Sequence, residues 1–404
     1  MNLSAIFSHV VHKRLVRGEL PHGGSNQHEL NGVAALKRFF VVNSATEGVM
    51  AWHYFADDAE PSREDGTFTF YDARAKSAHR TGRSEWRFYY YGEFLSRADV
   101  GDWIFLARSH DGRIFALVFQ DNSAWLRAAQ VLFGVETSGA SFDEIGENKL
   151  DSQQLQLMRR QIVDELGLGI AVPANRSDEE IMMDTFQGVF PTTAEMSAFA
   201  RSEVEVDSTD ADAALLSWLD REEQLFRAME NVIIRKRIDD GFPTVDDFIS
   251  YSLSVQNRRK SRMGFALQNH LAEIFNRHRV QYTAQCRTEG KSKPDFIFPG
   301  HAEYHNVHFK QSLLVMLGVK SSSKERWRQV LDEADRIPRK HLCTLDQGIS
   351  TAQTDAMRRR KITLVVPDGL HATYTDGQLS HMLTVGEFID VVRRNRNQAG
   401  PRAS

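Results

Sequence analysis

Two stretches of sequence determine how the C-terminal part of this chain folds: KPDFIFPG at Lys293–Gly300 and LGVKSSSKERWRQVLDEAD at Leu317–Asp335. In the first, Asp295 directly follows a proline and opens an apolar run, which predicts a short buried strand with a carboxylate at its start. In the second, Lys320 closes another apolar run, and the serines after it are candidate N-caps for a helix. The pattern therefore predicts a carboxylate and a lysine at the ends of two strands, with a second carboxylate, Glu333, in the helix beyond.

The sequence around these stretches alternates between strand-like and helix-like segments. The expected strands are residues 280–285, 295–298, 312–320, 341–345 and 362–367, and the expected helices are 263–278, 324–337 and 353–360. Such an alternation is typical of a sheet with helices packed on it. We therefore expect the C-terminal part to be an α/β domain.

The carboxylates and the lysine suit one kind of chemistry. Hydrolysis of a phosphodiester at neutral pH uses a divalent cation, and Mg²⁺ prefers carboxylate oxygens. Asp295 and Lys320 would supply a ligand and a group that holds water or phosphate. Sites of this kind often carry the second carboxylate two residues before the lysine, where this chain has Gly318, so Glu333 is expected to replace it. On an ideal helix Glu333 lies roughly 10 Å along the axis from Arg326, close to the same face.

The start of that expected helix is rich in groups that can contact nucleic acid. Within KERWR, three cations can donate to guanine or phosphate and one carboxylate can accept from cytosine: Lys324, Glu325, Arg326 and Arg328. A second basic run, Arg258, Arg259 and Lys260, is a candidate phosphate clamp. The alternative for both runs is an exposed helix whose charges are solvated or paired with each other, and a Pro-Asp pair with a distant lysine also occurs by chance. Only the ordered combination carries weight.

The N-terminal part contains short aromatic-rich segments separated by turn signals. Asp111 and Gly112 stand between two apolar runs, which predicts a β-hairpin. A mostly β domain, forming a small barrel, is expected. Residues 71–97 hold six Lys or Arg and three Asp or Glu. This segment is either a solvated strand face or a surface that contacts DNA, and the polar stretch at residues 22–32 is a candidate second arm of that surface.

Length and composition bound the remaining possibilities. A chain of 404 residues exceeds one ordinary core, so two domains are expected. The net charge of −4 conceals an uneven distribution, because residues 140–213 hold 16 acidic and only 5 basic residues. The rest of the chain is therefore net basic, which keeps a nucleic-acid partner open. Two cysteines with no metal-binding spacing, and no apolar run near the roughly 20 residues of a membrane span, predict a cytoplasmic protein.

From about Asp239 to Val366 the sequence resembles the catalytic domain of EcoRII-type restriction endonucleases. The resemblance lies in SVQNRRKSRMG, TEGKSKPDFIFP, AEYH, GVKSSSKERWRQVLDEAD, HLCTLDQGIS and KITLVVPDGLH. It implies that Asp295 and Glu333 hold Mg²⁺, that Lys320 serves the attacking water, and that Tyr304 lies at the active site. It also implies that the segment Lys324–Arg326 reads CC/GG bases.

A looser resemblance covers the N-terminal part. The effector domain of the EcoRII family is a B3-like β-barrel that binds a second copy of the recognition site. Its R-x-E-x-R segment is similar to Arg83, Glu85 and Arg87, whereas its glycine-rich arm matches only approximately the residues 22–32. The target of this domain, which is the same site, another site or a modified base, is left open.

These observations give one combined expectation. Residues 1–171 form a B3-like DNA-binding effector domain, 172–188 a linker, and 189–404 a restriction-endonuclease-like nuclease domain. The chain is expected to be a type II endonuclease that cuts double-stranded DNA at a CC/GG-containing site with Mg²⁺. A palindromic site presents two equivalent strands, so a homodimer through the catalytic domain is expected. The alternatives are a nuclease that depends on a methylated cytosine, and a DNA-binding regulator without catalytic activity.

Overall fold

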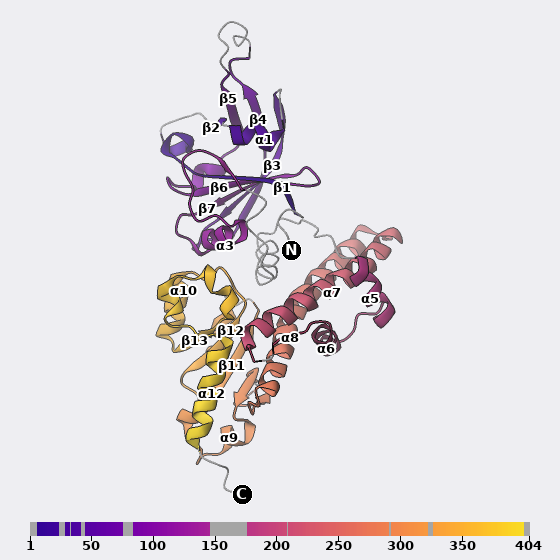
Figure 1. Cartoon of the computed structure of the whole chain (residues 1–404), viewed down its shortest axis with the longest axis vertical. Coiled ribbons are helices and arrows are strands. Elements are labelled where there is room, and N and C mark those ends of the chain that lie inside the picture. Colours follow the sequence, from indigo (N-terminus) through magenta and orange to yellow (C-terminus); the bar gives the residue numbers. More distant parts are fainter. Residues whose placement is uncertain are drawn as a thin grey trace. The chain divides into compact units, whose positions relative to one another are not determined.

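The computed structural model describes residues 6–23, 29–32, 34–41, 45–75, 84–145, 176–207, 209–290, 292–321 and 326–399. The chain divides into two compact units, Met1–Val172 and Pro173–Ser404. The first unit is built on a curled sheet, and the second places helices around a smaller sheet (Figure 1). The expected fold class, a β-rich N-terminal domain followed by an α/β domain, is confirmed.

The N-terminal unit contains an eight-stranded sheet in the order β2-β5-β4-β3-β7-β6-β1-β8. The pairing of β3 with β7 is parallel, and the other pairings are antiparallel. The strands are β1 (Phe7–Arg14), β2 (Glu29–Gly32), β3 (Thr46–Phe55), β4 (Ser62–Asp72), β5 (Trp86–Tyr91), β6 (Trp103–Ser109), β7 (Ile114–Phe119) and β8 (Asp143–Glu144). The hairpin expected at Asp111 and Gly112 joins β6 to β7, and Gly112 adopts a φ of 85°, which favours glycine.

Aromatic side chains fill the core of this unit. Helix α1 (Ala34–Phe40) inserts Phe40 against Phe68, Phe70 and Phe88, with ring centroids 4.9 to 5.6 Å apart. Because side chains alternate along a strand, these inward aromatics leave the other face of β4 and β5 to polar residues. The described residues of this unit also form helix α3 (Ala124–Phe133) and the short 3₁₀ helices η2 (Arg17–Glu19), η3 (Pro21–Gly23) and η4 (Phe94–Arg97).

The C-terminal unit contains a five-stranded sheet in the order β13-β12-β11-β10-β9. The strands are β9 (Thr283–Ala284), β10 (Phe296–Phe298), β11 (Val315–Lys320), β12 (Lys340–Thr344) and β13 (Ile362–Val365). Strand β10 is antiparallel to both of its neighbours, β9 and β11, and β11, β12 and β13 run parallel. The smaller helical elements are α9 (His301–His305), η5 (Gln311–Leu313), η6 (Arg326–Asp332), α10 (Thr351–Arg359), η7 (Asp368–Thr373), α11 (Asp376–Leu379) and α12 (Val385–Ala399).

Helices α8 (Val245–Arg277) and α12 cover the sheet through aromatic contacts. Phe275 of α8 lies edge-on to Phe296 and Phe298, each at 5.2 Å between ring centroids. Phe388 of α12 contacts Phe298 at 5.5 Å. These contacts fix the position of α8 relative to β10.

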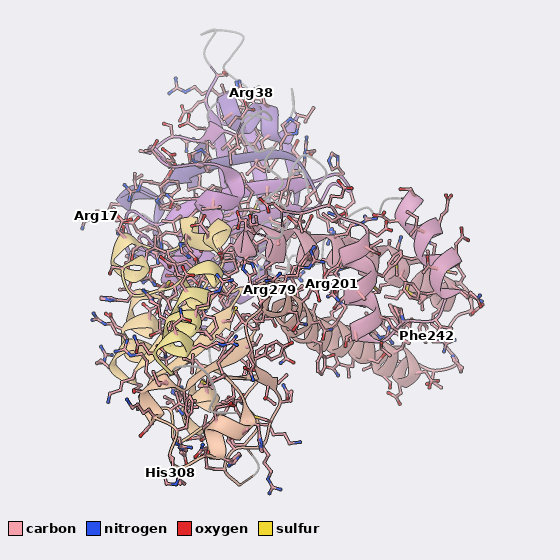
Figure 2. All side chains as sticks on the ribbon, turned by 60° about the horizontal axis from the view of Figure 1, so that its bottom comes forward. Arg17, Arg38, Arg201, Phe242, Arg279 and His308 are labelled. Atoms are coloured by element: carbon pink, nitrogen blue, oxygen red, sulfur yellow. The ribbon has the colours of Figure 1, made fainter. Side chains whose placement is uncertain are left out.

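Four helices form a bundle at the start of the unit: α5 (Arg176–Phe186), α6 (Thr193–Ser202), α7 (Ala211–Asp239) and α8. Within the expected linker at residues 172–188, the structure forms helix α5, whose Met182 is buried against the bundle. Helix α8 starts 18 residues earlier than the expected start at Met263, because Thr244 caps it and α7 packs along it. Phe242 lies in the turn between the two long helices, beneath the Arg237 guanidinium at 4.5 Å (Figure 2).

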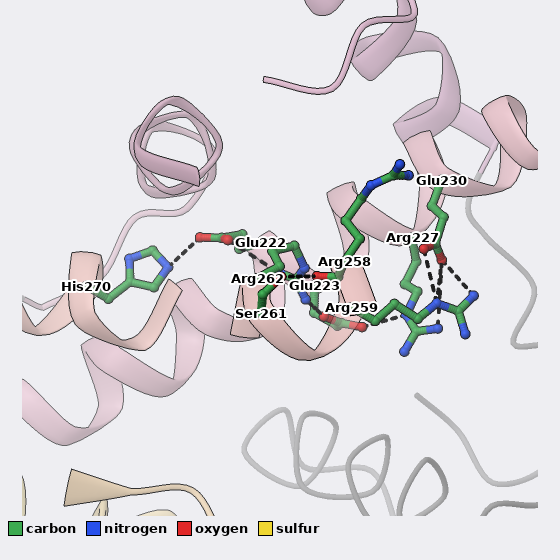
Figure 3. A network of polar contacts seen from close by, with 9 residues as sticks. All are labelled: Glu222, Glu223, Arg227, Glu230, Arg258, Arg259, Ser261, Arg262 and His270. Atoms are coloured by element: carbon green, nitrogen blue, oxygen red, sulfur yellow. Dashed lines mark hydrogen bonds and ion pairs between the residues drawn. The ribbon is translucent and has the colours of Figure 1, made fainter. Parts of the chain in front are cut away.

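A buried layer of charged side chains joins α7 to α8 (Figure 3). Arg262 of α8 donates to Glu222 at 3.2 Å and also to Glu223, and these three residues are at most 5% exposed. His270 Nε2 lies 3.0 Å from Glu222 Oε2. Further along, Arg259 Nη2 lies 2.7 Å from Glu230 Oε2. The bundle is thus held by complementary charges as well as by its apolar core.

Cys286 and Cys343 are buried free thiols. None of the described helices combines the length and apolar character that a membrane-crossing segment needs.

Candidate active site

The antiparallel pair β10–β11 brings Asp295 and Lys320 to the same edge of the sheet. Asp295 directly precedes β10, and Lys320 is the last residue of β11. The register pairs Phe296 with Leu317, so the beginning of one strand lies beside the end of the other. The backbone N–H of Val319 donates to Asp295 Oδ2 at 2.6 Å, which fixes this juxtaposition.

The Asp295 carboxylate is buried and surrounded by hydrogen-bond donors. Its residue is 7% exposed. Gln268 Nε2, from α8, donates to Oδ1 at 2.7 Å, and Gln285 Nε2 donates to the same oxygen at 2.8 Å. Burial raises the pKa of Asp295, although the Val319 N–H and the Lys320 charge oppose that rise by favouring the ionised form.

Glu333 is the second carboxylate of the site. Burial, reinforced by the negative charge of Asp295, raises the pKa of Glu333 to about 7, and the charges of Lys320 and Lys340 oppose the rise. Glu333 is therefore close enough to Asp295 and Lys320 to interact with both. Its Oε2 atom is buried and has no hydrogen-bond partner among the described residues. A buried carboxylate oxygen without a donor is an available ligand for a cation.

The α-helix expected over residues 324–337 is wrong. Residues Arg326–Asp332 instead form the 3₁₀ helix η6, and Glu333 lies in the bend after it. The buried residues Trp327 and Val330 are three positions apart, which matches the three residues per turn of a 3₁₀ helix. Ala334 then adopts a φ of 52°, which ends the right-handed path. The α-helical spacing between Arg326 and Glu333 therefore does not apply.

The structure gives a steric reason for the glycine two residues before Lys320. A Cβ atom at Gly318 would lie 3.0 and 3.3 Å from the two methyl groups of Val330. Val330 is fully buried and belongs to η6. The space that a carboxylate at position 318 would occupy is thus filled by the element that leads to Glu333.

Tyr304 supports the bend that carries Glu333. Its side chain is buried, its hydroxyl donates to Glu289, and the same oxygen accepts from the Arg336 N–H at 3.3 Å. The second oxygen of Glu289 accepts from the Asp335 N–H at 3.2 Å, and the Arg336 guanidinium donates to the backbone carbonyl of Tyr304. Tyr304 is therefore placed to hold the backbone just after Glu333.

Lys340 supports the same bend from β12. Its Nζ donates to the backbone carbonyls of Glu333 and, at 3.3 Å, of Ala334. Burial lowers the pKa of Lys340, while nearby carboxylates such as Asp335 and Glu333 oppose the change. This amine adds positive charge close to Glu333 without occupying its Oε2 oxygen.

The expected base-reading segment lies partly beyond the described residues. Lys324 and Glu325 are outside them, and of Arg326 only the backbone is described. Arg328 is exposed on η6, with its guanidinium 5.1 Å from the ring of Trp327. The role of this segment stays a prediction.

The expected phosphate clamp lies on α8, and its members differ in their surroundings. Arg258 stacks over the ring of Phe190 at 4.4 Å. Arg259 is paired with the buried Glu230, as described above, and the side chain of Lys260 is outside the described residues. At least one of the three charges is therefore already neutralised within the bundle.

In the N-terminal unit, the expected R-x-E-x-R segment is described from Glu85 onward, and Arg83 lies outside the described residues. Glu85 pairs with both Arg74 and Arg87 at 2.6 Å, and Arg87 also pairs with Glu29 at 3.1 Å. Hydrogen bonds from Arg87 and then from Arg74 lower the pKa of Glu85. Glu85 and Arg87 are neighbours in a charged cluster, and their contact with DNA stays a prediction.

Sequence reasoning did not find five residues that shape this site: Gln268, Gln285, Glu289, Arg336 and Lys340. Glu289 and Lys340 stand in stretches already notable for charge, but their partners are 15 or more residues away in the chain or are backbone carbonyls. The two glutamines gave no signal, since isolated amides are ordinary on a helix or in a loop.

The donor set restricts which cation could bind. The described residues contain no group of three or more His, Cys, Asp and Glu side chains that could hold a metal ion. Two carboxylates and no sulfur or imidazole are unsuited to a structural Zn²⁺ site. They fit Mg²⁺, which is often bound through one or two carboxylates, with waters and substrate phosphates completing its coordination.

Comparison with known proteins supports the resemblance seen in the sequence. Residues 226–389 match the family described as EcoRII C terminal. The type II restriction enzyme EcoRII of Escherichia coli is 42% identical over 201 residues, which are 50% of this chain and 50% of that protein. The chain therefore matches only about half the length of this curated relative.

Two solved structures are also similar. Metal-depleted Ecl18kI in complex with uncleaved, modified DNA has a TM-score of 0.44 and 16% identity, covering 55% of this chain and 84% of that chain. A complex of the restriction endonuclease PspGI with substrate DNA has a TM-score of 0.41 and 16% identity, covering 56% of this chain and 94% of that chain. The resemblance to EcoRII-type restriction endonucleases over the C-terminal part is confirmed by the family match and the EcoRII relative alone.

Proposed function

Starting from the match of residues 226–389 to the EcoRII C-terminal family, we propose that this chain is a type II site-specific deoxyribonuclease. Three observations support the proposal: the hydrogen bond that holds Asp295 beside the end of β11, the electrostatic effect of Asp295 and Lys320 on Glu333, and a buried Glu333 oxygen that lacks a hydrogen-bond donor in the described part of the chain. The reaction is hydrolysis of a phosphodiester bond in each strand of double-stranded DNA.

Asp295 and Glu333 would hold a Mg²⁺ ion, because the buried Asp295 and the partly buried Glu333 each have an acceptor position that no described residue occupies. Bound there, the cation would polarise the scissile phosphate and lower the pKa of a coordinated water. The raised pKa of Glu333 means that a proton competes with the cation for this carboxylate near neutral pH. Burial of both groups also strengthens their electrostatic effect on a substrate phosphate.

Lys320 would orient the attacking water and stabilise the charge that develops on the phosphate. Lys320 ends β11 and its charge acts on both Asp295 and Glu333, so it would offset the repulsion between these two carboxylates and a phosphodiester. Tyr304 and Lys340 would keep Glu333 in place by holding the bend at residues 333–336. Preorganised charge of this kind is usually a large part of the catalytic effect.

Recognition is assigned to residues on both units. Lys324, Glu325, Arg326 and Arg328 would contact the bases of a CC/GG-containing site, and Arg258, Arg259 and Lys260 would contact phosphates. In the N-terminal unit, Arg83, Glu85 and Arg87 of a B3-like domain would bind DNA as an effector or targeting module. The catalytic domain would act as a homodimer, because a palindromic site presents two equivalent strands. The proposed location is the cytoplasm.

The test is cleavage of supercoiled plasmids that carry or lack CC/GG-containing sites, in the presence of Mg²⁺ or of a chelator. The intact chain should linearise only the plasmid that carries sites, and only with the cation. Lys320→Ala should lose cleavage while keeping sequence-specific binding in a gel-shift assay, whereas Lys236→Ala, an exposed lysine on α7, should behave like the unchanged protein. Near-normal cleavage by Lys320→Ala would show that the active site is elsewhere.

A further inference from the structure

Two glutamine side chains converge on a single oxygen of Asp295. Gln268 reaches Oδ1 from α8, and Gln285 reaches the same atom from the loop after β9. Because a carboxylate can only accept hydrogen bonds when ionised, both amides must present their N–H groups to it. Two neutral donors from separate elements therefore share one oxygen of the carboxylate that is proposed to hold a cation.

Gln285 is held in place by its backbone as well. Its N–H donates to the backbone carbonyl of Asp295 at 3.0 Å, and its φ of 50° lies in the left-handed region, which is uncommon for glutamine. This conformation turns the side chain back toward the residue with which its backbone is already paired. Such local strain is often retained where a side chain has to point in one direction.

The geometry leaves Asp295 with few free acceptor positions. Each carboxylate oxygen offers about two lone pairs. On Oδ1 both are used by Gln268 and Gln285, and on Oδ2 one is used by the Val319 N–H at 2.6 Å. Among the contacts of the described residues one position therefore remains, on Oδ2, and a cation that binds Asp295 without breaking these bonds must use that oxygen alone.

We propose that Gln268 and Gln285 are positioning residues that restrict Asp295 to single-oxygen coordination and thereby favour Mg²⁺ over Ca²⁺ at this site. The inference rests on the proposed function, because it takes the carboxylates to be cation ligands. Mg²⁺ is bound at 2.0–2.1 Å in octahedral geometry, usually through one oxygen of each carboxylate. Ca²⁺ takes six to eight oxygens at longer distances and often uses both oxygens of a carboxylate, which the two amides prevent.

The chemistry of the amide explains why a glutamine is suited to this task. An amide donates to a carboxylate at any pH, since it does not titrate in this range. A glutamate at position 268 would instead add a third negative charge within 3 Å of Asp295 and would itself become a ligand. A lysine would neutralise the carboxylate that has to attract the cation. The neutral donor fixes the direction of Oδ1 without changing the charge of the site.

The test measures cation binding to the full-length chain without DNA, so it does not depend on turnover. Mn²⁺, which resembles Mg²⁺ and is visible by electron paramagnetic resonance, is titrated directly, and Ca²⁺ is titrated by its displacement of Mn²⁺. Gln268→Met and Gln285→Met remove the donors at similar length. Each should lower the ratio of the Ca²⁺ Kd to the Mn²⁺ Kd at least threefold, and the double variant should lower it further.

Two controls separate the possible failures. Gln281→Met alters an exposed glutamine just before β9 and should leave the ratio unchanged. Asp295→Asn should abolish Mn²⁺ binding, and binding that persists in this variant would overturn the proposed cation site together with this inference. If Asp295→Asn loses Mn²⁺ but both methionine variants keep the ratio within twofold of the unchanged protein, the cation site stands and the role assigned to the glutamines is wrong. Because the two glutamines lie on different elements, misfolding of one variant leaves the other as a test.

Discussion

The contact between Gly318 and Val330 gives a quantitative prediction. In Gly318→Ala, the new methyl group would lie 3.0 Å from Val330 Cγ2 and 3.3 Å from Cγ1, inside ordinary van der Waals distance. Val330 is fully buried, so it can move only by displacing η6 or neighbouring core residues. Overpacking of this kind costs about 1–3 kcal/mol. We expect Gly318→Ala to lower the free energy of unfolding by that amount.

A double-mutant cycle isolates the contact. Val330→Ala removes both clashing methyl groups, so Gly318→Ala should cost little in that background, and the coupling energy should be about 1–3 kcal/mol. The assay is equilibrium urea unfolding of the four proteins. Gly264→Ala in α8 is the matched control, because its Cβ would meet only Ser321 Oγ at 4.0 Å. That substitution should stabilise the protein by roughly 0.5–1 kcal/mol, since alanine is the better helix former.

Plasmid cleavage by the four proteins should follow the same pattern as their free energies of unfolding. Displacement of η6 shifts the bend at Glu333, so Gly318→Ala should reduce plasmid cleavage at least tenfold and Val330→Ala should partly restore it. Additive free energies, with the double variant destabilised by the sum of the two single changes, would refute the steric account of the glycine.

Three further predictions concern other parts of the chain. Burial lowers the pKa of His53 to about 4, whereas the unfolded chain binds this proton near pH 6.5. The free energy of unfolding should therefore fall by up to roughly 3 kcal/mol as the pH drops from 6.5 to 4. In urea unfolding at several pH values, His53→Phe should remove that part of the pH dependence. Arg262→Leu should destabilise the chain by about 3–5 kcal/mol, because Glu222 and Glu223 would lose a buried cation, whereas an unchanged melting temperature would contradict this. Tyr304→Phe should lose roughly 1–3 kcal/mol by leaving Glu289 and the Arg336 N–H short of a partner, and it should weaken Mn²⁺ binding if the bend positions Glu333.

The sequence predicted the elements whose signals are local. The hairpin at Asp111 and Gly112 and the strands that end at Lys320 and begin after Asp295 follow from turn chemistry and apolar runs, which act within a few residues. The segment before Glu333 was assigned to the wrong kind of helix. Its charged residues favour an α-helix, but burial at Trp327 and Val330 and the close approach to Gly318 select a 3₁₀ helix. Those contacts come from another strand and cannot be read from the segment itself.

The supporting residues of the site were also beyond the reach of the sequence. The side chain of Glu289 accepts hydrogen bonds from a tyrosine hydroxyl 15 residues away and from a backbone N–H 46 residues away. Gln268 contacts Asp295 across 27 residues. Such pairings are set by tertiary packing, so the sequence could nominate candidate catalytic side chains but not the groups that contact and orient them.

The charged layer between α7 and α8 also has a consequence for molecular recognition. In the four contacts described there, α7 supplies the carboxylates of Glu222, Glu223 and Glu230, and α8 supplies the guanidinium groups of Arg259 and Arg262 and the imidazole of His270. Two copies of α7 brought together would bury like charges, and so would two copies of α8. Glu222 pairs with residues near the C-terminal half of α8 and Glu230 with an earlier one, so the pairing also encodes an antiparallel direction. The charges therefore favour pairing of an α7 with an α8 over pairing of either helix with a second copy of itself. If two copies of the chain exchanged one of these helices, the α7 of one copy would have to pair antiparallel with the α8 of the other.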